Sequence, residues 1–236
     1  MTRSLILVIG GTRGVGREVV QRLAARGERR VRVLARDPAR ARRDLPAGVE
    51  IRPGDLTQPQ SLGPAIEGTS HIVFTAGVPS GTYASENLVR RTDYDGVLHT
   101  LTAARQQQPP PRLLYLNSMG VDAPSPAGAL INTLKRNTLV WRRRVEADIR
   151  ASGIRYTIIR VGFLVDKPVG RRDIALSQDS RPLAVGKQIA RADVAEAFIA
   201  ALDDANTVHA TFDIVWGRGR RRENWADLFS GLRPDS

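Results

Sequence analysis

Three glycines near the start of the chain, Gly10, Gly14 and Gly16, are spaced G-x-x-x-G-x-G within Ile-Gly-Gly-Thr-Arg-Gly-Val-Gly. Gly11, Gly14 and Gly16 also nearly fit the older G-x-G-x-x-G spacing, so the register of the pattern is open. Glycine lets a backbone turn tightly and approach an anion closely. The free N–H groups of a helix that starts at such a turn can bind a diphosphate.

The segments around these glycines supply the elements that such a site needs. An apolar run at 5–9 predicts a buried strand, and Val19, Val20 and Leu23 share one face of a helix over 17–26. Strand, glycine-rich turn and helix together are typical of dinucleotide binding. The pattern thus predicts cofactor contacts from Gly10, Thr12, Arg13, Gly14, Val15 and Gly16. A turn without a ligand is the competing interpretation.

Apolar runs and helical patterns alternate along the rest of the chain, which indicates a parallel sheet with crossover helices. Further strands are expected at 31–34, 49–51, 71–74, 113–116, 156–159 and 211–215, with a short one at 174–176. Helices are expected at 87–106, 133–152, 193–202 and 224–232. The predicted fold is α/β: a Rossmann-like, doubly wound parallel sheet of about seven strands. It forms a single domain over 1–236, in which 162–190 contributes a small substrate lobe.

The residues after the second strand indicate which dinucleotide is bound. NAD-selective sites place an acidic residue there, whereas this chain has Ala35-Arg36. Asp37 follows and precedes Pro38, so it can instead cap the next helix. The Arg36 guanidinium, helped by Arg13, would pair with a 2′-phosphate. These residues predict NADP(H), with NADPH favoured over NADH; two merely solvated arginines are the alternative.

Composition narrows the function classes further. The 236 residues carry 36 basic and 24 acidic side chains, a formal charge of +12. Arginine as the default surface cation explains this charge better than nucleic-acid or membrane binding, because the basic run at 218–222 lacks aromatic stacking partners. Cysteine is absent and the three histidines are scattered, so no metal site is expected. No transmembrane run or signal-peptide pattern occurs, and a cytoplasmic protein is expected.

Several short motifs, in this order, resemble the short-chain dehydrogenase/reductase superfamily, particularly its atypical NAD(P)H-binding branch of NmrA-like and biliverdin/flavin reductase-like proteins. They are Gly-Gly-Thr-Arg-Gly-Val-Gly at 10–16, Val-Leu-Ala-Arg-Asp-Pro at 33–38, Gly-Asp-Leu at 54–56, Thr-Ala-Gly at 75–77, Asp-Tyr-Asp-Gly at 93–96, Tyr-Leu-Asn-Ser-Met-Gly at 115–120, the segment 150–160 and Ile-Ala-Arg-Ala-Asp-Val-Ala at 189–195.

The resemblance implies roles for residues at the carboxyl ends of the strands. It places Asp55 and Leu56 beside the adenine, and Thr75, Ala76 and Gly77 along the adenosine ribose. Asn117 and Ser118 would lie near the nicotinamide ribose. The turn Val161, Gly162 and Phe163 would shield the nicotinamide, with valine where proline is usual.

One departure from the superfamily concerns its Tyr-x-x-x-Lys motif, in which tyrosine donates the proton and lysine holds the ribose. Aligned by Glu146 and the Arg-Ala-Ser-Gly segment, Arg144 takes the lysine position and Val140 the tyrosine position. Valine cannot transfer a proton, and arginine stays protonated. Arg144 would hold the ribose or an anionic substrate, or else belong to a solvated helix face. Ser118 would donate a hydrogen bond to the acceptor, or else be structural.

These residues predict an NADPH-dependent oxidoreductase that reduces a small organic acceptor needing little proton assistance: a quinone, a flavin or a conjugated carbonyl. The alternative is a non-catalytic NADP(H)-binding sensor of the NmrA type. Sugar-nucleotide or isomerase chemistry is less favoured because those relatives are longer and usually keep the tyrosine. Besides its small-molecule substrate, the protein is expected to have no nucleic-acid or membrane partner, and to be a monomer or homodimer.

Overall fold

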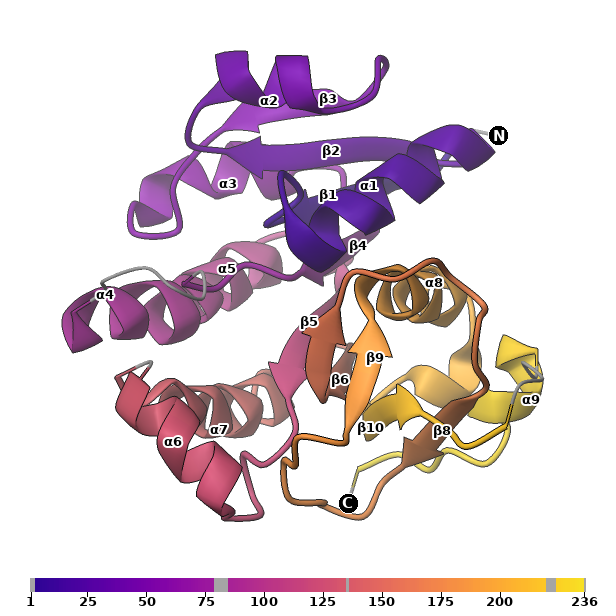
Figure 1. The fold of residues 1–236 in the computed structure, drawn as a ribbon. Coiled ribbons are helices and arrows are strands. Elements are labelled where there is room, and N and C mark those ends of the chain that lie inside the picture. Colours follow the sequence, from indigo (N-terminus) through magenta and orange to yellow (C-terminus); the bar gives the residue numbers. More distant parts are fainter. Residues whose placement is uncertain (1–2, 79–84, 135, 220–223, 236) are drawn as a thin grey trace.

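A parallel sheet with helices on both faces forms the centre of the protein (Figure 1). The structure is a computed structural model that describes residues 3–78, 85–134, 136–219 and 224–235. The strand order of its eight-stranded sheet is β3-β2-β1-β4-β5-β6-β10-β8, and β8 alone pairs antiparallel. The chain reverses its direction of winding between β1 and β4, which is where open α/β sheets bind ligands.

The strands of this sheet are short and largely buried. They are β1 (Leu5–Ile9), β2 (Arg30–Ala35), β3 (Glu50–Pro53), β4 (His71–Phe74), β5 (Arg112–Ser118), β6 (Tyr156–Val161), β8 (Ile174–Ser177) and β10 (Ala210–Trp216). A separate two-stranded sheet pairs β7 (Phe163–Val165) with β9 (Gln188–Ala190). The predicted doubly wound α/β fold is therefore confirmed, and both small-sheet strands belong to the 162–190 segment.

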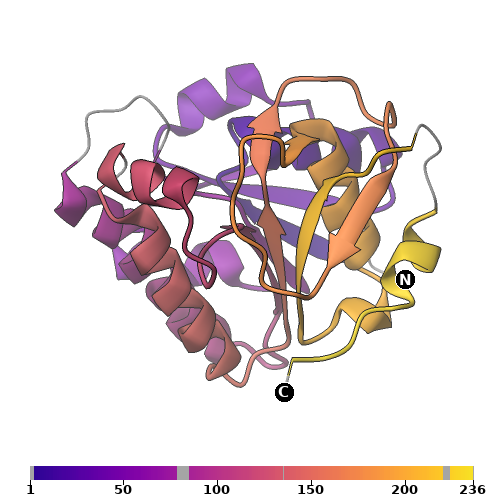
Figure 2. The same cartoon turned by 60° about the horizontal axis from the view of Figure 1, so that its bottom comes forward.

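Two apolar clusters fill the two faces of the sheet. One lies under α1 (Gly14–Arg26) and α8 (Arg191–Ala201), and includes Phe198 and Phe212. The other lies under α3 (Gly63–Ile66), α5 (Gly96–Arg105) and α7 (Thr138–Arg150), and includes Phe74 and Tyr115. Figure 2 shows α6 (Pro126–Leu134) and α7 on one side of the molecule and α9 (Trp225–Phe229) on the other. The remaining helices are α2 (Pro38–Asp44), α4 (Glu86–Val89) and the short 3₁₀ turns 59–61 and 205–207.

Two predicted helices are interrupted in the structure. The helix expected at 87–106 consists of α4, a π-helical turn at Arg90–Asp95, and α5. The helix expected at 133–152 is broken between α6 and α7, because Arg136 and Asn137 both have positive φ. The first interruption contains Asp93, which contacts the Val78 backbone N–H after β4, and the second is followed by Thr138, which contacts Asp93. In the described ranges, no helix is long and apolar enough to span a membrane.

Candidate functional site

At two positions of the turn after β1, Gly10 and Gly16, a side chain larger than hydrogen would not fit. Gly10 has φ of +89°, and a Cβ there would lie 2.6 Å from the backbone nitrogen of Ala76. A Cβ on Gly16 would lie 2.4 Å from the carbonyl oxygen of Gly10. The turn therefore packs backbone against backbone between β1 and the loop after β4, with Val15 buried beneath it.

The N-terminus of α1 faces outward from this turn. Arg13 is the N-cap residue, yet no side chain accepts a hydrogen bond from the first turn, and that turn contains no acidic residue. Gly14 is exposed, and a Cβ on it would meet nothing within 4 Å. Uncapped N–H groups with open space before them suit a bound diphosphate. Thr12, half-buried in the same turn, lies directly before Arg13.

The residues after β2 separate the two roles considered for Asp37. The Asp37 carboxylate accepts a hydrogen bond from the backbone N–H of Arg40 at 3.0 Å and so caps α2. The capping interpretation is therefore confirmed. Arg36 is exposed at the same strand end, as is Arg13 one strand away. Two exposed arginines thus follow the neighbouring strands β1 and β2.

The Asp55 and Leu56 pair after β3 is fixed by local hydrogen bonds. The Asp55 carboxylate accepts from the backbone N–H of Thr57 at 2.8 Å and from its hydroxyl at 2.9 Å. Leu56 is buried, and its carbonyl oxygen lies 2.8 Å from His99 Nδ1. The structure thus places this pair at the same edge as the glycine turn, two strands from β1.

Asp93, in the π-helical turn, organises the loop after β4. Its carboxylate is 2% exposed and accepts hydrogen bonds from the Val78 backbone N–H at 2.9 Å and the Thr138 hydroxyl at 3.0 Å. Its Oδ2 also lies 3.7 Å from Nε of Arg142. Single π turns often occur at functional sites. Sequence reasoning noted Asp93 only as part of a motif and did not foresee this role.

The inward-facing cation of α7 is Arg142, not Arg144. A guanidinium nitrogen of Arg142 donates to the Leu116 carbonyl oxygen at 3.1 Å, and another would lie 2.7 Å from a Cβ on Gly77. Burial alone lowers the pKa of Arg142, but Tyr115 and Asp93 beside it hold that pKa above its ordinary value. Arg142 is thus a fixed positive charge at the edge that holds Thr75, Ala76 and Gly77.

Arg144 lies elsewhere, with its guanidinium carbon 4.9 Å from the ring centroid of Trp141 and its side chain exposed. Val140 is 42% exposed and faces away from the edge. Counting one turn back from Arg142 reaches Thr138 instead. Neither residue has a phenolic hydroxyl, so the departure from Tyr-x-x-x-Lys holds in either alignment.

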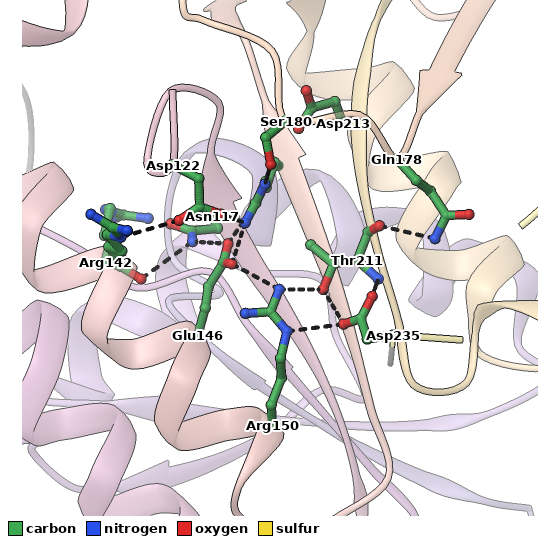
Figure 3. Close-up of polar contacts among 12 residues, drawn as sticks. Asn117, Asp122, Arg142, Glu146, Arg150, Gln178, Ser180, Thr211, Asp213 and Asp235 are labelled. Atoms are coloured by element: carbon green, nitrogen blue, oxygen red, sulfur yellow. Dashed lines mark hydrogen bonds and ion pairs between the residues drawn. The ribbon is translucent and has the colours of Figure 1, made fainter. Parts of the chain in front are cut away.

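Asn117 at the end of β5 belongs to a buried polar network, drawn in Figure 3. Its amide nitrogen donates to Glu146 Oε1 at 2.5 Å and lies 3.4 Å from the Arg142 carbonyl oxygen. Arg160 on β6 donates to the same carboxylate through Nε at 2.7 Å, and its other nitrogens contact Asp122 and Ser180. Burial alone lowers the pKa of Arg160, but the Glu146 and Asp122 carboxylates raise it above its ordinary value. These contacts fix the position of the Asn117 side chain at the end of β5.

The last two predicted positions lie next to this network. Ser118 is half-buried, and its hydroxyl donates to the Met119 carbonyl oxygen at 3.1 Å. Val161 and Gly162 are buried and Phe163 is half-buried. A Cβ on Gly162 would lie 2.2 Å from the Lys187 carbonyl oxygen, so β9 packs directly against this turn. The structure therefore brings the predicted residues, Arg144 excepted, to the carboxyl edge of one sheet.

Asp213 on β10 is a buried carboxyl group close to the same network. It is 3% exposed, and its carboxylate accepts a hydrogen bond from the Arg181 backbone N–H at 3.4 Å. Burial raises its pKa to about 6, against the lowering effects of Arg160 and of the Arg181 N–H. The folded protein holds this proton between about pH 4 and pH 6 while the unfolded chain releases it, so the contribution of Asp213 to stability falls as pH rises through this window.

Replacing Asp213 with asparagine is therefore expected to stabilise the protein at neutral pH, by about 1–3 kcal/mol. The gain over the wild type should shrink towards zero as pH falls from about 6 to about 4. Chemical denaturation of both proteins across this range measures the difference. A variant that is less stable than the wild type at neutral pH would contradict the assignment.

These features define a class: a doubly wound α/β protein whose sheet edge fits a nicotinamide dinucleotide. A profile described as NAD(P)H-binding matches residues 10–205, and the chain belongs to this NAD(P)H-binding family of oxidoreductases. Sanguinarine reductase of Eschscholzia californica is 28% identical over 268 residues, covering 97% of this chain and 96% of that protein. The predicted resemblance to the atypical short-chain dehydrogenase/reductase branch is confirmed.

Two solved structures share the fold. The oxidoreductase ylbE of Lactococcus lactis has a TM-score of 0.77 at 17% identity, covering 97% of this chain and 96% of that one. A short-chain dehydrogenase/reductase of Veillonella parvula, solved in complex with NADP, has a TM-score of 0.70 at 15% identity, covering 93% of this chain and 97% of that one.

Proposed function

We propose that the protein is an NADPH-dependent reductase of a small conjugated acceptor, such as a quinone, a flavin or an enone. The observation that carries the proposal is that Arg142 lies at the edge of the sheet, while Thr138, one helical turn before it in α7, has no phenolic hydroxyl. The cation of the superfamily motif has a counterpart at the edge of the sheet, whereas the tyrosine does not. Acceptors whose reduction needs little help from an acid suit such a site. When bound, reduced NADP supplies the hydride.

In this proposal the residues of the chain bind the cofactor and orient it towards the acceptor. The diphosphate is assigned to Gly10, Thr12, Gly14, Val15 and Gly16, the adenosine to Asp55, Leu56, Thr75, Ala76 and Gly77, and the nicotinamide side to Asn117, Val161, Gly162 and Phe163. Because Arg142 rather than Arg144 lies at the edge, we assign the ribose contact to Arg142. Ser118 must release the Met119 carbonyl oxygen before it can donate to an acceptor oxygen, and water delivers the proton.

The test follows NADPH oxidation with a panel of quinones, flavins and enones. Turnover of at least one class, with simple carbonyl compounds unreduced, would support the proposal. Steady reduction of unconjugated ketones would contradict it, because that reaction relies on an acid that Thr138 cannot replace. The name of sanguinarine reductase, which matches nearly the whole chain, supports reductase chemistry.

A second candidate is an NADP(H)-binding sensor that does not turn over. The observation that favours it is the Thr138 hydroxyl, which is buried and already donates to Asp93. Tight NADP(H) binding together with no oxidation on any acceptor of the panel would select this alternative.

The choice of NADPH over NADH depends on Arg36, which is exposed beside the end of β2 and forms no ion pair among the described residues. Replacing Arg36 with alanine is expected to weaken NADPH binding by about 1.5–3 kcal/mol, the value of a hydrogen bond to a charged group. NADH binding should hardly change. Titration calorimetry with both cofactors measures this, and equal losses for both would reject the assignment.

A further inference from the structure

A basic hollow lies beyond the end of β10, beside the turn assigned to the nicotinamide. Four cationic side chains line it, from Arg171, Arg172, Lys187 and Arg218, together with the indole of Trp216. Its volume of about 680 Å³ falls within the range of about 300–1,000 Å³ that is typical of small-molecule sites. We refer to these five residues and the space between them as the basic hollow.

The position of the hollow follows from the topology. β10 runs parallel to β6, so Trp216 ends at the same edge of the sheet as Val161 and Gly162. Neighbouring strands lie about 4.8 Å apart. Lys187, which lines the hollow, also contacts the nicotinamide turn directly: its carbonyl oxygen accepts a hydrogen bond from the Phe163 N–H at 2.7 Å. The hollow therefore adjoins the nicotinamide turn.

The residues to which we assign the cofactor's own phosphates lie on the other half of the edge. The glycine turn follows β1 and Arg36 follows β2, whereas β4, β5 and β6 separate β1 from β10. In Figure 1, β2 and β3 lie at the top, and β8, β9 and β10 lie at the lower right. The positive charge of the hollow is thus available to another ligand.

The walls of the hollow are held by buried contacts. Asp193 is fully buried, and its carboxylate accepts from the Trp216 indole N–H at 2.9 Å and from the Gly170 backbone N–H at 2.8 Å. These bonds hold the wall of the hollow and the loop that carries Arg171 in fixed positions. The Arg172 guanidinium lies 4.9 Å from the centre of the Trp216 ring.

Within the described ranges none of the four cations forms an ion pair, although Asp173 lies nearby against Gly217 and Gly219. Arg191, by contrast, is paired with Asp166 at 2.8 Å. Four unpaired cations around one concave space attract an anion, and arginine binds carboxylates and phosphates well.

We propose that the basic hollow binds the carboxylate or phosphate arm of the hydride acceptor, and so selects anionic acceptors. The proposal rests on the reductase function and specifies its substrate class. The ring system of the acceptor would then reach the nicotinamide turn while its anionic arm stays among the cations.

Two flavins provide matched probes, because FMN and riboflavin share one ring system and differ by a phosphate. Binding is measured by equilibrium dialysis, and turnover by NADPH oxidation. FMN should bind roughly tenfold or more tightly than riboflavin, and high salt should reduce the difference. In Arg171→Gln/Arg172→Gln, FMN should lose most of this advantage while riboflavin binding stays unchanged.

The matched control is Arg3→Gln/Arg155→Gln, which removes the same charge from exposed positions before β1 and β6, at the opposite edge of the sheet. It should leave both flavins unaffected. FMN binding no tighter than riboflavin, or equal losses for both in the hollow variant, overturns the inference. Selective FMN binding without turnover on any acceptor would keep the hollow as an anion-binding site and remove the reductase function on which the rest of the proposal depends. Turnover of an acceptor with no preference for FMN over riboflavin would keep the reductase proposal and overturn the inference.

Discussion

Replacing Glu146 with alanine is expected to destabilise the protein by about 3–5 kcal/mol, because it leaves a buried guanidinium without its main counter-charge. Glu146 is 1% exposed and Arg160 is 5% exposed. Among the residues that the structure describes, Arg160 would keep Asp122 and Ser180 as partners, and the Asn117 amide would lose its 2.5 Å acceptor. Urea denaturation at neutral pH measures the change through the transition midpoint.

Two further variants separate charge from hydrogen bonding. Glu146→Gln keeps an acceptor for Asn117 but removes the negative charge that faces Arg160, so an intermediate loss is expected. Glu18→Ala removes a partly exposed helix pair with Arg22, and should cost less than about 1 kcal/mol. If Glu146→Ala were as mild as Glu18→Ala, the buried network would not be what holds β5, β6 and α7 together.

This network shows what sequence alone could and could not supply. Leu5–Ile9 and the glycines after it predicted the turn and its helix because strand, turn and helix are all encoded within about 20 neighbouring residues. The Glu146–Arg160 contact joins α7 to β6, and it forms only when this helix packs on the sheet. The spacing of residues in the sequence does not indicate which arginine will be buried against Glu146.

The choice between Arg142 and Arg144 is a similar case. The sequence alignment treated 133–152 as one helix, whereas α7 begins at Thr138 after two residues of positive φ. Helical spacing contained a usable signal: Arg142, Val145 and Ile149 follow at i, i+3 and i+7, and the last two are fully buried. Arg144 lies off this stripe. Asp93 was harder to find, because a π turn shifts the helical register and leaves no mark in the pattern of apolar residues.

Replacing Gly16 with alanine is expected to abolish most NADP(H) binding, with a loss of roughly 100-fold or more, as the third glycine of this turn must allow close packing. The new Cβ would lie 2.4 Å from both the Gly10 carbonyl oxygen and the Thr75 hydroxyl. Since one of these is backbone, the turn itself must move, and with it the N–H groups at the start of α1. Overpacking should also cost about 1–3 kcal/mol of stability.

Gly63→Ala is the matched control for this variant. Gly63 also begins a helix and has ordinary φ, but a Cβ there would meet nothing within 4 Å. The control should bind NADPH like the wild type and be equally or slightly more stable, because alanine is the better helix former. Titration calorimetry and thermal shift with NADPH compare the two variants. A Gly16→Ala protein that folds and binds NADPH normally would show that the turn after β1 does not hold the diphosphate, and the assignment of the whole sheet edge would fall with it.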